Sequence, residues 1–101
     1  MQVLYKKPGL PPEVLEIENE LEKYQELVDG YIEVVRFGDY CLIVNEEGWL
    51  KNLQDNFYME AIDQMIYGPA VFTRLNEARD DFAGMNDNDI KWIRYRLGWR
   101  C

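Results

Sequence analysis

The 101-residue chain contains no histidine and no serine, and its one threonine is Thr73. These absences remove Ser-His and Cys-His catalytic pairs, zinc sites with imidazole ligands, and the commonest general base near neutral pH. Cys41 lies inside an apolar run and Cys101 stands at the end of the sequence, so neither fits a metal-type pair or a disulfide framework. We expect a non-enzymatic protein without a cofactor or metal, in a reducing compartment.

Long apolar runs are also missing. No stretch approaches the length of a membrane span, and the N-terminal residues lack the pattern of a signal peptide. The 7 glycines stand singly, as turn and cap residues do, and form no recognisable phosphate-binding loop. We expect a cytoplasmic protein that does not bind membranes.

Basic side chains are the minority, because 11 lysines and arginines accompany 19 aspartates and glutamates, for a net charge of -8. Non-specific nucleic-acid binding needs cations on the contacting face, so direct nucleic-acid binding is disfavoured and a basic protein is the expected partner. The charged residues of 13–33 are all acidic apart from Lys23. They fit either a solvated surface or a docking face, and in the second case the expected contacts are Glu20, Glu22 and Glu26.

The N-terminal third predicts a β-hairpin followed by a helix. "QVLYKK" alternates apolar and polar residues, and "EVLEI" can return as a second strand after the break "PGLPP". A helix is expected over residues 20–28, because Asn19 and Glu22 have capping-box spacing and Asp29-Gly30 suits a helix end. A start near Pro12 remains an alternative. The apolar face of this helix comprises Leu21, Tyr24 and Val28.

The central segments favour strands. "YIEVVRF" and "YCLIVN" flank Gly38-Asp39 and predict a tight hairpin. "WLKNL" is expected as a third strand or edge piece, and "NFYMEAIDQMIYG" favours a short helix over residues 58–64 rather than a strand. "PAVFTRL" predicts a strand after Pro69, and "NEARDDFAGM" a loop with room for a short return strand. The predicted fold is α+β: one domain over residues 1–101, with a small, mainly antiparallel sheet and two or three helices packed on it.

The last predicted helix has two apolar faces. "NDND" supplies N-cap candidates, and Ile90, Ile93 and Leu97 form one stripe at helical spacing. A second stripe contains Trp92, Tyr95 and Trp99, among the cations Lys91, Arg94, Arg96 and Arg100. This stripe can lie inside the domain, with Trp99 folded back after Gly98, or against a second copy or a foreign protein. We interpret Trp92, Tyr95, Trp99 and Arg96 as partner-binding residues.

Carboxylate chemistry has little support. Glu46-Glu47 and Asp80-Asp81 are adjacent acids in expected turns, where solvation is the ordinary role. "NDND" resembles part of a calcium loop but lacks the glycine and the distant glutamate of an EF-hand, so helix capping is the better interpretation.

Five segments together resemble the domain of unknown function 3846 family: "QELVDGYIEVV" (25–35), "NEEGWL" (45–50), "LQDN" (53–56), "IYGPAVF" (66–72) and "DNDI" (87–90). "GYIEVV" with "NEEG" is the most specific part, and the aromatic-basic ending departs from the pattern. The resemblance carries over no established enzymatic activity. Its matching positions fit turn and cap roles, except Glu33 and Glu46, for which we find none; the others are Gly30, Tyr31, Asn45, Gly48 and Asn56.

What the resemblance implies is a short acidic protein of a phage or mobile element, acting in the cytoplasm of an infected or element-carrying bacterial cell. The leading hypothesis is a counter-defence inhibitor of the anti-CRISPR or anti-restriction type, with a host nucleic-acid-binding defence enzyme as partner and a homodimer as the expected assembly. An alternative is an oligomeric sponge that traps a nucleotide-type immune signal, with aromatic stacking and arginine contacts to phosphate. An accessory or structural role is a third hypothesis.

Overall fold

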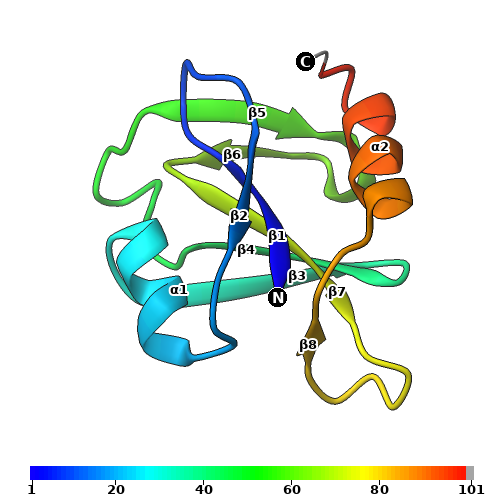
Figure 1. The fold of residues 1–101 in the computed structure, drawn as a ribbon. Coiled ribbons are helices and arrows are strands. Elements are labelled where there is room, and N and C mark those ends of the chain that lie inside the picture. The colour runs from blue at the N-terminus through cyan, green and yellow to red at the C-terminus, as the bar shows by residue number, and fades with distance from the viewer. Residues whose placement is uncertain (100–101) are drawn as a thin grey trace.

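The computed structural model describes residues 1–99 and contains eight strands, two α-helices and one 3₁₀ turn (Figure 1). In chain order the elements are β1 (Gln2–Lys6), β2 (Glu13–Glu16), α1 (Leu21–Val28), β3 (Ile32–Phe37), β4 (Tyr40–Asn45), β5 (Asp55–Met59), η1 (Glu60–Ile62), β6 (Gln64–Tyr67), β7 (Ala70–Leu75), β8 (Phe82–Ala83) and α2 (Asp87–Arg96). The predicted α+β class with a mainly antiparallel sheet is confirmed.

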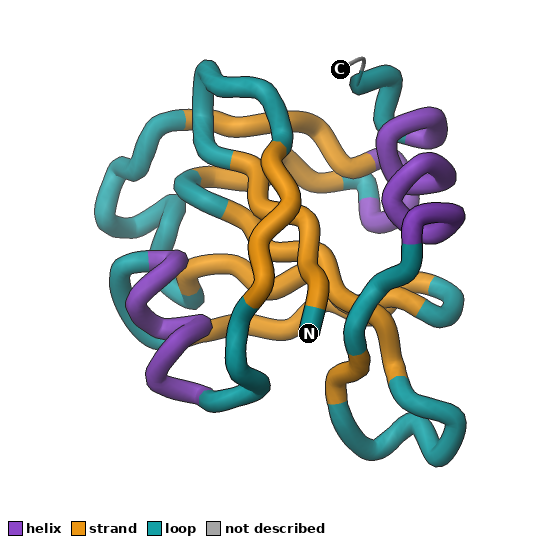
Figure 2. Tube along the Cα trace, in the orientation of Figure 1, coloured by secondary structure: helices purple, strands orange, loops and turns teal. Residues whose placement is uncertain are grey.

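Six strands form the main sheet, in the order β2-β1-β7-β4-β3, with β8 paired to the C-terminal end of β7. Strands β5 and β6 form a separate two-stranded sheet (Figure 2). Every pairing is antiparallel. Strands β3 and β6 therefore each have one side without a strand partner in the described part of the chain, which matters for the site below.

The three central strands of the main sheet, β1, β7 and β4, are buried on both faces, to which their side chains point alternately. One face packs against α1, where Tyr24 and Val28 meet Ile43 and Val71. The other face is covered by the β5–β6 sheet and α2, whose contributions to the core are Met59, Ile66, Ile90 and Ile93, packed on Leu42 and Phe72. The near-continuous apolar runs of β4 and β7 reflect this double burial.

Three sequence predictions of strand pairing are confirmed. β1 and β2 form the first hairpin. β3 and β4 form the second, with Gly38 at φ 59° in the turn, a conformation that costs glycine little. The return strand expected in the loop after β7 is present as β8.

Helix α1 matches the expected 20–28 within one residue, but its predicted N-terminal cap is wrong. Glu20 is the N-cap residue and makes no side-chain capping bond. Asn19 instead donates to Asp81 Oδ1 at 3.2 Å and accepts from the Tyr24 hydroxyl at 2.7 Å. The alternative start near Pro12 is also wrong, because β2 occupies that segment. Leu21, expected on the buried face, is exposed.

Two further expectations are corrected between β4 and β7. Residues 49–52 form turns rather than a third strand. The helix expected over residues 58–64 is replaced by the end of β5, the η1 turn and the start of β6. Tertiary packing explains the difference, since the hairpin places Met59 and Ile66 in the core while η1 makes the reversal, with Asp63 at φ 52°.

Candidate functional site

The predicted acidic contacts lie together on and beside α1. Glu20, Glu22 and Glu26 are all exposed, and we call them the α1 acidic face. Of the three, Glu26 alone forms an ion pair among the described residues, with Lys23 Nζ at 3.8 Å. The helix is held to the sheet by buried Tyr24 and Val28, so these carboxylates project from a fixed support.

The two stripes of α2 have different fates. Ile90 and Ile93 are buried, as expected, and Leu97 packs beside them. The second stripe divides: Tyr95 is 83% exposed and Trp92 44% exposed. Trp99 turns back over the core and does not share the exposed side of Trp92 and Tyr95.

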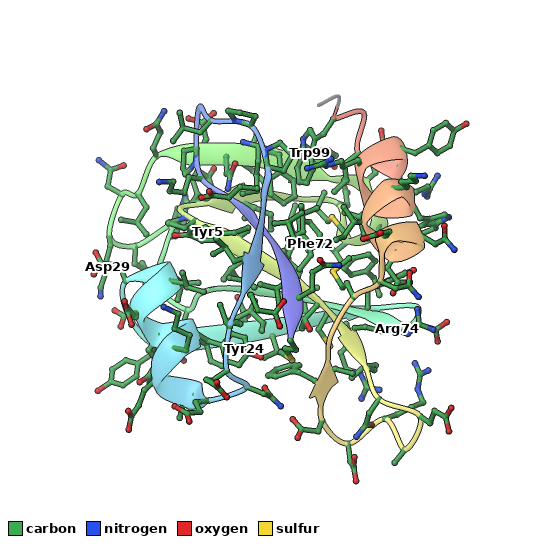
Figure 3. All side chains as sticks on the ribbon, viewed as in Figure 1. Tyr5, Tyr24, Asp29, Phe72, Arg74 and Trp99 are labelled. Atoms are coloured by element: carbon green, nitrogen blue, oxygen red, sulfur yellow. The ribbon has the colours of Figure 1, made fainter. Side chains whose placement is uncertain are left out.

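The turn at Gly98 explains the position of Trp99 (Figure 3). Gly98 adopts φ 71°, and the Trp99 amide then donates to the Arg94 carbonyl at 2.8 Å. The indole ring packs edge-on against Phe57 and Phe72, with centroids at 4.9 and 5.6 Å. Folding back was one of the alternatives left open by the sequence, and it packs the Trp99 ring against side chains of the same monomer.

Trp92 and Arg96 line a groove of about 230 Å³ between η1 and α2, together with Phe37, Tyr58 and Glu60. We call it the α2 groove. Trp92 stacks on Tyr40 at 5.3 Å, with the rings inclined by 17°. The Arg96 guanidinium lies over the Trp92 ring at 5.9 Å from its centroid. The structure thus brings two of the predicted partner-binding side chains to one partly open apolar surface.

Asp89 anchors the helix beneath this groove. Its Oδ1 accepts from the Tyr40 hydroxyl at 2.8 Å and from Arg74 Nη1 at 2.6 Å. Its Oδ2 accepts from the Asn86 amide at 2.9 Å, which completes a capping box with the Asn86 side chain. Burial, followed by the hydrogen bond to Asp89, raises the pKa of Tyr40 above its ordinary value. The network fixes the ring on which Trp92 stacks.

A second hollow, missed by the sequence analysis, separates β3 from β6. This β3–β6 cleft has a volume of about 320 Å³ and is lined by Glu33, Glu46, Trp49, Gln64 and Tyr67, over a floor that includes Val35 and Val44. Glu33 faces Val44 in the β3–β4 register, and the Glu46 amide donates to the Tyr31 carbonyl at 2.8 Å. These pairings make Glu33 and Glu46 diagonal neighbours on one face of the sheet.

The turn that carries Glu46 is fixed by buried polar contacts. Asn45 Nδ2 donates to the carbonyls of Val28 and Asp29 at 3.0 and 3.1 Å, and its Oδ1 accepts from the Glu47 amide at 2.8 Å. A Cβ on Gly48 would lie 2.7 Å from the Tyr67 carbonyl oxygen, so only glycine permits this close approach to β6. The cleft is therefore bordered by a rigid turn.

The remaining candidates take local structural roles. Asp80 accepts from Asn76, and Asp81 accepts from the Phe82 amide, as turn residues do.

Within residues 1–99 no group of three or more His, Cys, Asp or Glu side chains is placed to hold a metal ion. No helix of that region is long and apolar enough to cross a membrane. Arg100 and Cys101 lie outside the described residues.

Comparison with known protein families gives a match over nearly the whole chain. The family model described as a domain of unknown function, DUF3846, matches residues 1–98. No curated protein and no solved structure matches the chain. The matched region includes the acidic face, the groove and the cleft, and also the aromatic-basic segment as far as Gly98.

Proposed function

The chain belongs to the DUF3846 family, and from that premise we propose that it is a non-enzymatic protein of a phage or mobile element that binds a host protein and inhibits or modulates it. The proposed target is a defence nuclease with a basic nucleic-acid channel, as in anti-CRISPR or anti-restriction inhibition. The proposed site of action is the cytoplasm of an infected or element-carrying bacterial cell. The observation that carries the proposal is the α1 acidic face.

Charge and support make this face suitable for a basic partner. The carboxylates of Glu20 and Glu22 are exposed and form no ion pair within residues 1–99, so their field is directed mainly to solvent. In a chain of net charge -8, such a face attracts a positively charged surface over about a Debye length and speeds encounter. A rigid row of negative charge is also what a nucleic-acid channel is built to receive.

The α2 groove supplies a different kind of contact. Trp92 and Arg96 of this groove, and the exposed Tyr95 of the same helix, are residue types that carry much of the energy of protein interfaces, because they bury a large area and keep a polar group. We propose that these side chains contact the host protein or the second copy of a homodimer. Trp99 is not included, since its ring packs on Phe57 and Phe72.

The test compares two charge-reversal variants in gentle affinity purification from a bacterial lysate, followed by native mass spectrometry. Glu20→Lys with Glu22→Lys should abolish capture of a stoichiometric host protein and flatten its dependence on salt. Asp55→Lys with Glu77→Lys is the matched control, because both side chains are exposed and the change in net charge is the same. Equal capture by the two variants would overturn the role of the acidic face.

The second candidate is the oligomeric sponge for a nucleotide-type signal. The α2 groove favours it, because exposed Tyr58 and Trp92 can stack on a base and Arg96 can meet a phosphate. This function requires a small molecule in the same native spectrum, bound to a homo-oligomer. A spectrum of homo-oligomer without additional mass would count against it.

A further inference from the structure

The β3–β6 cleft lies over the face of β3 and β4 and beside β6, and two of these strands, β3 and β6, have an unpaired side within residues 1–99. β3 is the last strand of the main sheet, and β6 belongs to a sheet of two strands. In the described chain no strand pairs with the outer side of either one. Unpaired N–H and C=O groups along such an edge can accept an extended segment of another chain.

The chemistry of the cleft selects a cation. Glu33 occupies a position in β3 whose neighbours along the same face, Val35 and Phe37, pack on the core. Within residues 1–99 its carboxylate and that of Glu46 have no ion pair or side-chain hydrogen bond, although both line the same hollow. Two neighbouring carboxylates without a counter-ion disfavour an anionic ligand and favour a positively charged group.

The aromatic side chain of Trp49 in the cleft favours arginine over lysine as the bound cation. Trp49 lines the cleft and is 71% exposed, so its ring is available to a ligand. A guanidinium can stack on an indole while donating to carboxylates in a fixed fork, which a lysine ammonium cannot do. Gln64 and Tyr67 on the β6 side add further polar groups at the rim.

We propose that the β3–β6 cleft binds an extended segment of a partner protein through one arginine, whose guanidinium lies between Glu33 and Glu46 and against Trp49. The backbone of the segment runs along the open edge of β3. The cleft is separate from the α1 acidic face, so this inference does not rest on the proposed target. It gives the protein a second contact, selective for a side chain rather than for overall positive charge.

The probe is a blocked pentapeptide, acetyl-Thr-Val-Arg-Val-Thr-amide, titrated into the full ¹⁵N-labelled chain. Its counterpart with citrulline in place of arginine keeps the shape and removes the charge. We expect the arginine peptide to shift the amide signals of Glu33 and Glu46 and the indole signal of Trp49. The citrulline peptide should bind the unchanged chain at least about tenfold more weakly than the arginine peptide does. The Glu33→Gln/Glu46→Gln variant should bind the arginine peptide more weakly by the same factor.

The matched control is Glu20→Gln with Glu22→Gln, which removes the same charge from the α1 acidic face. It should bind the arginine peptide as the unchanged chain does. Both pairs of residues are exposed, so neither change should disturb the core. The amide spectrum of each variant checks that the fold is kept.

Three results would overturn the inference: no shifts at the cleft, shifts confined to α1, or equal loss in the two glutamine variants. The last would identify non-specific charge attraction. Host-protein capture in the lysate experiment is a separate readout, so failure of either proposal leaves the other standing.

Discussion

Asp89 is the residue on which the C-terminal part of the structure depends most. It is 5% exposed and accepts hydrogen bonds from Tyr40, Arg74 and the Asn86 amide. A buried carboxylate with several donors is stabilising only while the whole set is intact, because removing its charge leaves the Tyr40 hydroxyl and the Arg74 guanidinium, which is 38% exposed, with a weaker acceptor.

We therefore predict that Asp89→Asn lowers the free energy of unfolding by about 2 kcal/mol, as expected for a buried, charge-assisted network. Asp87→Asn is the control, since it removes the same charge from the first turn of α2 at an exposed position. Urea denaturation of the two variants at pH 7 measures the difference. Similar losses in both would mean that the helix dipole, and not the network, is the source of the effect.

The same scale separates what could be read from the sequence from what could not. Asn86 was predictable as a cap, because its partner Asp89 lies three positions away. Asn19 has the same local signal, yet its amide contacts Asp81 and Phe82, 62 and 63 positions along the chain. The spacing of a capping box does not reveal a competing partner so distant in sequence.

At the scale of elements, the end of α2 shows how a helix with two apolar faces is accommodated. One stripe packs on the core, and the helix stops before Trp99, so that a reversal at Gly98 brings the indole to Phe57 and Phe72. Lys6 also lies under this ring, with its Nζ 5.8 Å from the centroid, and burial lowers the pKa of that lysine. The C-terminal turn thus closes one end of the core.

Trp99→Ala should accordingly lower the free energy of unfolding by about 2 to 3 kcal/mol, somewhat less than truncation of a fully buried tryptophan. Tyr95→Ala should leave it within about 0.5 kcal/mol, because this side chain is 83% exposed. Thermal and urea unfolding of both variants provide the measurement. A larger loss for Tyr95→Ala would mean that the chain covers this residue by self-association under the conditions used.

Elements joined by short turns were predictable, and elements fixed by distant packing were not. The β3–β4 hairpin follows from β-branched strands on either side of Gly38-Asp39. Residues 58–64 carry apolar spacing that also suits a helix, and only contacts with Phe72 and the rest of the core select the hairpin of β5 and β6. Local pattern leaves that choice open.

At the scale of the whole molecule, the α+β class follows from the pattern of elements, but the β3–β6 cleft does not. The cleft exists because the small β5–β6 sheet covers the main sheet only in part and leaves the Glu33 end of β3 open. Glu33 and Glu46 could be noticed in the sequence as unassigned acids. Their meeting depends on strand register and on the placement of a second sheet.

The distribution of charge over the molecule has a consequence for stability. The acidic side chains of residues 13–33 are exposed, and the Lys23–Glu26 pair is long at 3.8 Å. Exposed ion pairs of this kind contribute little, whereas like charges on one surface repel each other over about 30 Å at 0.01 M salt and about 8 Å at 0.15 M. Repulsion should therefore outweigh attraction in dilute buffer.

We predict that raising NaCl from about 10 mM to about 150 mM moves the urea midpoint upward, since screening relieves repulsion in a chain of net charge -8. Glu20→Gln with Glu22→Gln should reduce the increase of the midpoint with NaCl, because it removes two of the charges that repel each other. Asp55→Gln with Glu77→Gln, with the same change in net charge, should have a smaller effect, because these residues lie in separate segments rather than within the acidic stretch. If salt instead lowers the midpoint, the Arg74–Asp89 and Arg79–Asp39 pairs outweigh the repulsion at α1. The acidic face would then carry little electrostatic strain to be relieved by a basic partner.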